Sequence, residues 1–181
     1  MSLPMDLTEK MLSREEKYTG AFLSVHVDQV SLPNGHTSFR EVVEHVDGGV
    51  AILALYEENN VTLVQQYRYP FHQVLLELPA GKLDPGEEPA VGALRELREE
   101  TGAVPDILMP LGVILPSPGC YGEHLHLFLA RELKMGQPDE DEFLRLERIP
   151  FQEMVHRIMN GEIEDAKTVA AVLKAKVLLD L

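Results

Sequence analysis

Three glutamates lie close together on a predicted helix and could hold a metal ion. The chain is predicted to be helical between Pro89 and Gly102, because proline suits the first helical turn and glycine suits the position just past the end. Glu96, Glu99 and Glu100 stand at i, i+3 and i+4, so they are neighbours on one side of this helix. Like charges at this spacing repel, and the macrodipole disfavours anions in the second half of a helix. A hard divalent cation such as Mg²⁺ or Mn²⁺ would offset that cost, since it takes oxygen ligands and bridges carboxylates to substrate phosphates.

The residues flanking these glutamates separate a metal site from a plain solvated acidic helix face, which the spacing alone would also fit. The run 81–103 follows the pattern G-x5-E-x7-R-E-U-x-E-E-x-G-U, in which U is a bulky aliphatic residue. The matching residues are Gly81, Glu87, Arg95, Glu96, Leu97, Glu99, Glu100 and Gly102. The one departure is Ala103, which is small at a packing position. This run resembles the signature of the Nudix hydrolases, and a chance match at so many positions is not a reasonable explanation.

The resemblance implies a fold, a reaction and a set of metal ligands. The fold is an α/β/α sandwich with a mixed sheet, and family members cleave a nucleoside diphosphate linked to another moiety. The implied Mg²⁺ ligands are Glu96, Glu100, the assisting Glu99 and the carbonyl of Ala80. The implied bracing positions are Gly81, Glu87, Arg95 and Gly102, which orient the carboxylates and their loop. A metal at this place would neutralise phosphate charge and lower the pKa of a bound water.

Several segments outside the motif resemble the ADP-ribose pyrophosphatase branch of the family. Pro118 follows Ala103 by fifteen residues, near the place where that branch carries a proline. The acidic segment 139–143 stands where the branch has a catalytic glutamate on a loop. Glu142 matches that position best, also as a metal ligand, and Glu140 is the alternative. Without the resemblance, the segment 139–143 would fit a solvated acidic loop equally well. The resemblance also implies a catalytic role for Glu99, beside Glu142 and Glu140.

The same resemblance implies residues that contact the substrate. They are Arg68, Phe22, Arg40, Glu41, Lys82, Ser117 and Glu123. An arginine suits a diphosphate because its fork of donors can bind two oxygens at once, although Arg68 alone fits a surface charge equally well. Phe22 stands where the branch often stacks an aromatic ring on the base, but it also fits a core position. Arg40 and Glu41 lie in a segment that resembles a strand binding adenine across a dimer.

The remaining patterns predict the elements that position these residues. Predicted strands are 22–32, 38–46, 49–57, 61–68, 74–78, 107–115 and 124–131, and the later predicted helices are 151–159 and 166–179. Asn34-Gly35 predicts a hairpin between the first two strands, and residues 58–60 predict a turn that pairs the next two. The first 20 residues are polar and predict a flexible or edge segment. We therefore expect an α/β (α+β) architecture with an N-terminal antiparallel hairpin extension, divided into residues 1–46, which dimerise, and a Nudix domain at 47–181.

Composition excludes several classes of protein. The 181 residues include 30 Asp and Glu against 16 Lys and Arg, a formal net charge of −14, which disfavours nucleic acid or an anionic membrane as partner. The single cysteine, Cys120, excludes an internal disulfide framework. No apolar run reaches the roughly 18 residues that span a bilayer, and the N-terminus lacks the apolar core of a signal peptide. We expect a cytoplasmic homodimer whose partner is a small-molecule nucleoside diphosphate sugar.

The expected function is Mg²⁺-dependent hydrolysis of ADP-ribose to AMP and ribose 5-phosphate, with Mn²⁺ as a possible substitute metal. One alternative is a hydrolase of another nucleoside diphosphate sugar, such as GDP-mannose. A second is a domain that binds a nucleotide as a sensor without cleaving it. The complete set of motif glutamates and Arg95 argues against the sensor.

Overall fold

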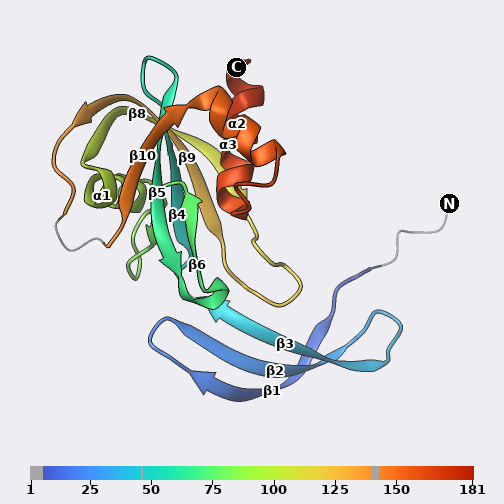
Figure 1. Ribbon diagram of the computed structural model, residues 1–181. Coiled ribbons are helices and arrows are strands. Elements are labelled where there is room, and N and C mark those ends of the chain that lie inside the picture. The colour runs from blue at the N-terminus through green and yellow to red at the C-terminus, as the bar shows by residue number, and fades with distance from the viewer. Residues whose placement is uncertain (1–5, 46, 140–142) are drawn as a thin grey trace. The chain divides into compact units, whose positions relative to one another are not determined.

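The computed structural model describes residues 6–45, 47–139 and 143–181. The chain divides into two compact units. One contains Met1–Val46 and Ser117–Glu123, and the other contains Asp47–Pro116 and His124–Leu181. Figure 1 labels the elements of both units.

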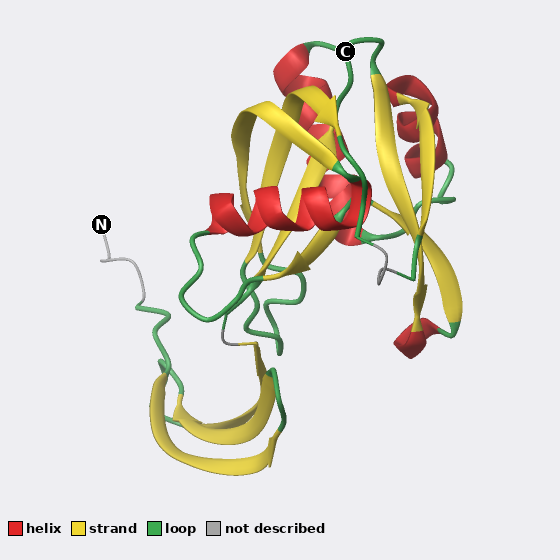
Figure 2. Cartoon of the chain, turned by 90° about the vertical axis from the view of Figure 1, so that its left-hand side faces the viewer, coloured by secondary structure: helices red, strands yellow, loops and turns green. Residues whose placement is uncertain are grey.

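The smaller unit is a three-stranded antiparallel sheet in the order β1-β2-β3. Its strands are β1 (Lys10–Thr19), β2 (Leu23–Ser31) and β3 (Thr37–His45), and Figure 2 shows that the sheet is strongly curved. Gly35 has a φ of 83°, which a side chain would disfavour, so the predicted hairpin turn is confirmed. The polar N-terminal segment forms β1, a fully exposed edge strand.

The larger unit contains two sheets and three helices. A mixed sheet has the order β7-β4-β9-β8, and a second sheet has the order β10-β5-β6. The first sheet is built from β4 (Gly49–Ala54), β7 (Ala80–Lys82), β8 (Ala103–Ile114) and β9 (Leu125–Met135). The second is built from β5 (Asn60–Arg68), β6 (Gln73–Glu77) and β10 (Arg145–Pro150), with a 3₁₀ turn, η1 (Tyr69–Phe71), between β5 and β6. The helices are α1 (Pro89–Thr101), α2 (Phe151–Met159) and α3 (Ala166–Leu179).

Alternate residues of β4 face two different layers of helices. Val50 and Ile52 share a buried cluster with Leu97 of α1, whereas Leu53 belongs to a cluster with residues of α2 and α3, including Phe151. Figure 1 shows α1 on one side of the strands and α2 and α3 on the other. Because both faces of β4 are covered, every residue of that strand is buried. The expected α/β/α sandwich with a mixed sheet is confirmed.

The pairing of β4 differs from the prediction. Residues 49–57 and 61–68 were expected to pair through a turn, yet β4 pairs with β7 and, in parallel, with β9, while β5 pairs with β6 and β10. Backbone pairing between the two segments is limited to an isolated bridge between Leu55 and Val61. A strand as apolar as β4 needs cover on both faces, and that cover comes from distant parts of the chain.

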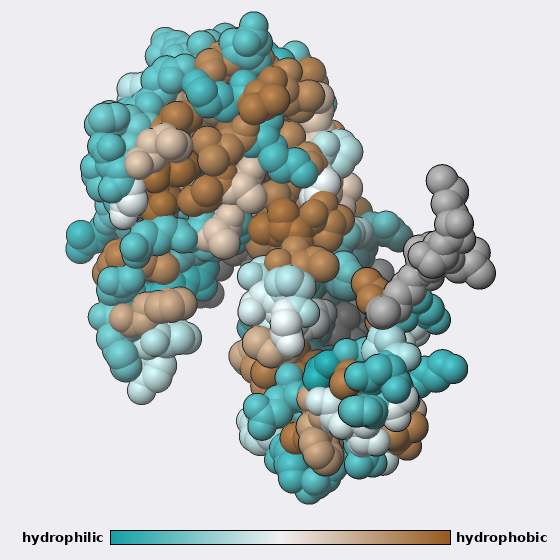
Figure 3. Space-filling view, turned by 90° about the vertical axis from the view of Figure 1, so that its right-hand side faces the viewer, coloured by the Kyte–Doolittle hydropathy of each residue, from teal (hydrophilic) through white to brown (hydrophobic). Residues whose placement is uncertain are grey.

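Hydrophobic residues gather on the face of the larger unit on which α3 lies, as Figure 3 shows. A groove of about 580 Å³ lies between β8 and α3. Its lining residues are Pro110, Leu111, Leu173, Lys174, Val177 and Leu178. None of the helices in the described part of the chain is long and apolar enough to cross a bilayer.

Candidate active site

Helix α1 carries the predicted metal ligands and ends as the sequence predicts. Pro89 begins the helix, and Gly102 follows its last residue with a φ of 73°, where its N–H donates to the carbonyl of Arg98. A Cβ at Gly102 would also lie 2.7 Å from the carbonyl oxygen of Gly136. Gly102 is therefore required both by its backbone conformation and by lack of space.

Two of the three glutamates converge on the short strand β7. The carboxylate of Glu96 lies so close to Gly81 that a Cβ there would be 2.0 Å from Cδ of Glu96. Glu100 is almost completely buried, and its Oε2 accepts a hydrogen bond of 3.0 Å from the backbone N–H of Ala80. The structure thus brings both carboxylates to the Ala80-Gly81 backbone.

Arg95 offsets the repulsion among the helix carboxylates. Its Nη1 donates to Glu96 at 2.7 Å and to Glu99 at 3.2 Å. Its Nε and Nη2 bind the two oxygens of Glu87 at 3.0 and 2.8 Å. The hydrogen bond from Arg95, with a second from the backbone N–H of Asp84, lowers the pKa of Glu87 to about 2. One guanidinium therefore ties the helix glutamates to the loop before the helix.

The loop between β7 and α1 is held by further contacts. Arg95 Nη2 donates to the carbonyl of Lys82 at 2.9 Å, and the N–H of Asp84 donates to Glu87 at 3.0 Å. Gly92 was not predicted to matter for this site, yet a Cβ there would lie 2.5 Å from Leu83 and 2.9 Å from a carboxylate oxygen of Glu87. Its signal was a glycine inside an otherwise helical pattern, which indicates close packing.

The donor set at β7 suits a hard divalent cation. Across residues 6–45, 47–139 and 143–181, no group of three or more Asp, Glu, His or Cys side chains is arranged to hold a metal ion. Mg²⁺ does not need such a group, because it commonly binds one or two carboxylates and completes its coordination with water and substrate phosphates. Glu96, Glu100 and the Ala80 carbonyl supply oxygen ligands of the required kind. The predicted residues Glu140 and Glu142 lie outside the described residues.

Arg68 is held by a buried carboxylate. Glu77 is 1% exposed, and its oxygens accept bonds of 2.7 Å each from Nε and Nη2 of Arg68. Lys167 donates to the same carboxylate and, at 2.9 Å, to Asp165. Burial raises the pKa of Glu77, but the hydrogen bonds from Arg68 and Lys167 outweigh it and leave the pKa below its ordinary value. Arg68 was predicted as a substrate contact, whereas Glu77, Asp165 and Lys167 were not among the predicted site residues.

The other predicted substrate residues are exposed, apart from Arg40 and Glu123, which are half-buried. In the smaller unit Phe22 is 52% exposed, with its ring centre 5.9 Å from that of His45. Arg40 donates to the carbonyl of Phe39 at 2.9 Å and pairs with Glu9. Glu41 is on β3, and Ser117 and Glu123 are in the segment that completes this unit. Lys82 is exposed at the end of β7 in the larger unit.

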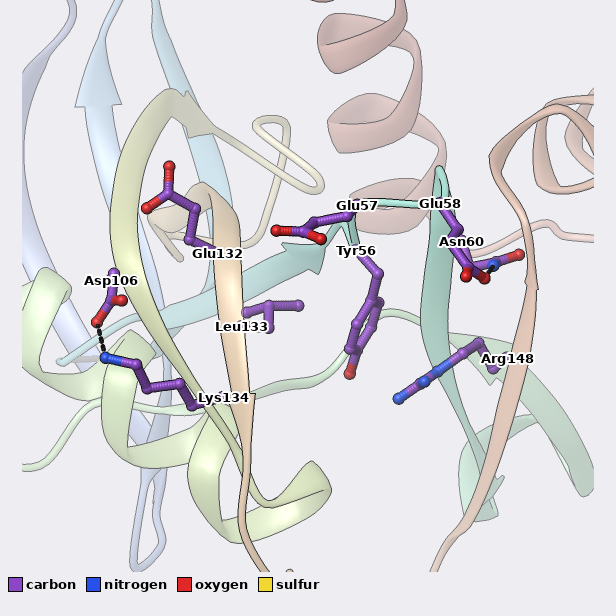
Figure 4. A pocket seen from close by; sticks show the side chains of 9 residues that line it. All are labelled: Tyr56, Glu57, Glu58, Asn60, Asp106, Glu132, Leu133, Lys134 and Arg148. Atoms are coloured by element: carbon purple, nitrogen blue, oxygen red, sulfur yellow. Dashed lines mark hydrogen bonds and ion pairs between the residues drawn. The ribbon is translucent and has the colours of Figure 1, made fainter.

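A second hollow in the larger unit is separate from these residues. It measures about 590 Å³, and its lining residues are Tyr56, Glu57, Glu58, Asn60, Asp106, Glu132, Leu133, Lys134 and Arg148. Figure 4 shows Arg148 stacked on Tyr56, with its guanidinium carbon 3.8 Å from the ring centre. Among residues 6–45, 47–139 and 143–181, none of the predicted site residues lines this hollow, so it is distinct from the site at Glu96 and Glu100.

Models of known protein families match segments of both units. The model of the NUDIX domain matches residues 46–172. The model described as "Nucleoside diphosphate sugar hydrolase N-terminal domain" matches residues 9–43.

Individual relatives cover nearly the whole chain. The "ADP-ribose pyrophosphatase" of Bacillus subtilis is 39% identical over 92% of this chain and 91% of its own length. The "Methanol dehydrogenase activator" of Bacillus methanolicus is 42% identical over 91% and 90%, respectively. The "GDP-mannose pyrophosphatase" of Pectobacterium atrosepticum is 31% identical over 93% and 92%. A solved structure titled "Crystal structure of ADP compounds hydrolase" has the same fold, with a TM-score of 0.85 at 22% identity over 99% of this chain and 97% of that one.

Proposed function

The chain belongs to the Nudix family and is a Nudix pyrophosphohydrolase, and from this premise we propose that it hydrolyses ADP-ribose with Mg²⁺ as cofactor. The observation that carries the proposal is the convergence of Glu96 and Glu100 on the Ala80-Gly81 backbone. The ADP-ribose pyrophosphatase from Bacillus subtilis supports the choice of substrate. In the reaction, water attacks one phosphorus, the P–O–P bond breaks, and AMP and ribose 5-phosphate leave.

The metal ligands of this proposal are Glu96, Glu100 and the carbonyl of Ala80, with Glu99 beside them. A divalent cation at this place supplies neutralisation of the phosphate charge and a bound water of lowered pKa. The chain's own contribution is positional, because Arg95 orients Glu96 and Glu99 while the N–H of Ala80 orients Glu100. On the strength of the resemblance, Glu142 or Glu140 is the base that takes the proton from the attacking water.

Arg68 is the proposed contact to the diphosphate. Glu77 holds one edge of its guanidinium, and the other edge keeps donors for phosphate oxygens. The hydrogen bond to Glu77 is the main cause that raises the pKa of Arg68, and the negative charges of Asp165 and Glu100 add to it. The remaining proposed substrate contacts are Lys82, Phe22, Arg40, Glu41, Ser117 and Glu123.

The smaller unit is the proposed dimerisation and base-binding element. A three-stranded sheet without a helix on it buries little apolar surface by itself. Several large apolar side chains of this sheet are exposed, namely Met11, Leu12, Tyr18 and Phe39. Contact with a second copy would cover such a surface. Light scattering tests this, and a monomer at the enzyme concentrations used in assays would overturn the homodimer.

A second candidate substrate is GDP-mannose, which the relative from Pectobacterium atrosepticum favours through its name. Both substrates contain the same diphosphate, so the metal site does not discriminate between them. The choice depends on contacts to the base and the sugar.

Product analysis by HPLC distinguishes these functions. The purified protein is incubated with ADP-ribose, GDP-mannose, UDP-glucose, NADH and a dNTP, each with Mg²⁺ and with EDTA. The proposal expects AMP and ribose 5-phosphate from ADP-ribose at the highest kcat/KM, and no turnover in EDTA. A higher kcat/KM for GDP-mannose selects the second candidate, and tight nucleotide binding without any product would point to a sensor.

A further inference from the structure

We infer that Lys167, at the start of α3, is a positioning residue that holds Arg68 in its substrate-binding orientation through the carboxylate of Glu77. The inference deepens the proposed function and rests on it, since Arg68 is the proposed diphosphate contact. It assigns a role to the segment Asp165–Thr168, which has no part in the proposed chemistry.

Glu77 connects the two cations. Its carboxylate, 1% exposed at the end of β6, accepts two bonds from Arg68 of β5. Lys167 approaches the same carboxylate from α3, ninety positions away in the chain. A buried carboxylate is stable only when its charge is compensated and its lone pairs are bonded. The position of Glu77, and with it that of Arg68, therefore depends on Lys167.

The start of α3 fixes Lys167 in place. Asp165 caps the helix by accepting bonds from the backbone N–H of Thr168 at 3.1 Å and from its hydroxyl at 2.6 Å. The other oxygen of Asp165 accepts from Lys167 at 2.9 Å. The Thr168 hydroxyl in turn accepts from the backbone N–H of Leu78 at 2.9 Å, so α3 is attached to the residue that follows Glu77. Lys167 is consequently held between two carboxylates on a supported backbone.

The four side chains that meet around Glu77 balance one another in charge. Arg68 and Lys167 supply two positive charges, and Glu77 and Asp165 supply two negative charges. Without Lys167, Arg68 would be the only cation between two carboxylates. The excess negative charge would then oppose a diphosphate at the neighbouring edge of Arg68, and the guanidinium would be less firmly oriented.

Arg68 retains donors for a ligand. Its guanidinium has five N–H groups in a rigid plane, and Glu77 takes one from Nε and one from Nη2. Within the described residues, Nη1 has no hydrogen-bond partner, and the side chain is 37% exposed. The edge that faces away from Glu77 is thus the one that can bind phosphate oxygens in the paired geometry that arginine favours.

The test compares Lys167→Met with Lys174→Met, which removes a charge from an exposed position of the same helix. Kinetics with ADP-ribose and Mg²⁺ separate KM from kcat. A second readout, which needs no turnover, is the rate at which the Arg68 Nε–H exchanges with solvent, measured by NMR of protein labelled with ¹⁵N-arginine. The Arg68 signal is assigned as the one that disappears in Arg68→Lys. For Lys167→Met we expect KM to rise about tenfold, which corresponds to the loss of roughly one charge interaction. We expect kcat to stay within threefold of wild type. We also expect faster Nε–H exchange, and no change in Lys174→Met.

Unchanged KM and unchanged Nε–H exchange in Lys167→Met would overturn the inference, as would a loss of kcat alone. If Lys167→Met does not fold, Lys167→Gln replaces it, because its amide still donates to Glu77 without a charge. Smaller shifts of KM and exchange in the same direction then support the inference, and wild-type values overturn it. If wild type does not hydrolyse ADP-ribose, the proposed function fails. In that case the inference is tested by Nε–H exchange and by the affinity for ADP, both compared between wild type and the Lys167 variant. Faster exchange and weaker ADP binding in the variant support it, and wild-type values overturn it.

Discussion

The carboxylate of Glu96 occupies the space into which a side chain at Gly81 would extend. A Cβ on Gly81 would lie 2.0 Å from Cδ and 2.1 Å from both carboxylate oxygens of Glu96. The helix that carries the glutamates and the strand that carries the Ala80 carbonyl can approach this closely only because position 81 has no side chain. The glycine of the motif is therefore required by the close approach of Glu96 to β7, where the metal is proposed to bind.

Gly81→Ala is expected to displace Glu96 and to lower kcat/KM by about a hundredfold, since a displacement of about 1 Å in a catalytic group has an effect of this size. The protein should remain folded, because the group that must move is the end of a side chain. Steady-state kinetics with Mg²⁺ and a thermal unfolding curve measure the two effects. Gly119→Ala is the matched control, as a Cβ there meets nothing within 4 Å. Wild-type activity in Gly81→Ala would contradict the proposed ligand role of Glu96.

Glu100→Gln is expected to reduce kcat/KM by roughly a hundredfold or more and to weaken Mn²⁺ binding measured by electron paramagnetic resonance. The amide lacks the charge that a hard cation requires. Glu88→Gln, at the residue that precedes the same helix, should retain activity, because Glu88 is exposed and makes no side-chain capping bond. Full turnover of Glu100→Gln with Mg²⁺ would exclude Glu100 as an essential ligand.

Thr168→Val is expected to destabilise the protein by about 2 kcal/mol. The fully buried hydroxyl of Thr168 is the acceptor for the backbone N–H of Leu78, and its removal leaves that donor unsatisfied. Chemical denaturation gives the free energy of unfolding. Thr168→Ser keeps the hydroxyl and should recover most of the loss. Equal stability of the valine variant and wild type would show that the contact between α3 and Leu78 contributes nothing.

The pKa of Glu147 predicts a pH-dependent contribution to stability. Hydrogen bonds from Arg157 and, less strongly, from Gln65 lower this pKa below its ordinary value of 4.5, although burial opposes them. A carboxyl whose pKa is lower in the folded state stabilises the fold above its unfolded pKa, and that contribution is lost as the pH falls through the folded pKa. Glu147→Gln should thus lower the free energy of unfolding by about 1 kcal/mol or less at pH 7, and the difference should shrink below pH 4.5.

Unfolding of wild type and Glu147→Gln by denaturant at pH 7 and at pH 3 tests this sign. Glu162→Gln, in the exposed connection between α2 and α3, controls for general effects of removing a charge. A difference that grows as the pH falls would be opposite to the expected direction.

Local signals explain why α1 and its glutamates were predicted correctly. Pro89 and Gly102 act through the backbone of their own segment, and the spacing of Glu96, Glu99 and Glu100 specifies one side of a helix without reference to the rest of the chain. The hairpin at Gly35 is local in the same way. The strands β7 and β10 were missed, since they are short and their pairing partners are distant in sequence.

The partners of Arg68 could not be predicted from its own neighbourhood. Glu77 lies on the strand paired with that of Arg68, and Lys167 lies on a helix ninety positions beyond Glu77. Nothing in the residue types at 68, 77 and 167 indicates that they share one buried site. Their meeting depends on the packing of α3 against the strands of the larger unit.

The family, the helix that bears the carboxylates and the kind of metal they suit follow from the sequence alone, because these depend on spacing within one short run. The close approach of Glu96 to Gly81, the bond from Ala80 to Glu100, and the separation of β4 and β5 into different sheets depend on how the chain packs. Those features arise from contacts between distant segments. Their geometry is set by burial of the shared core, which no local pattern encodes.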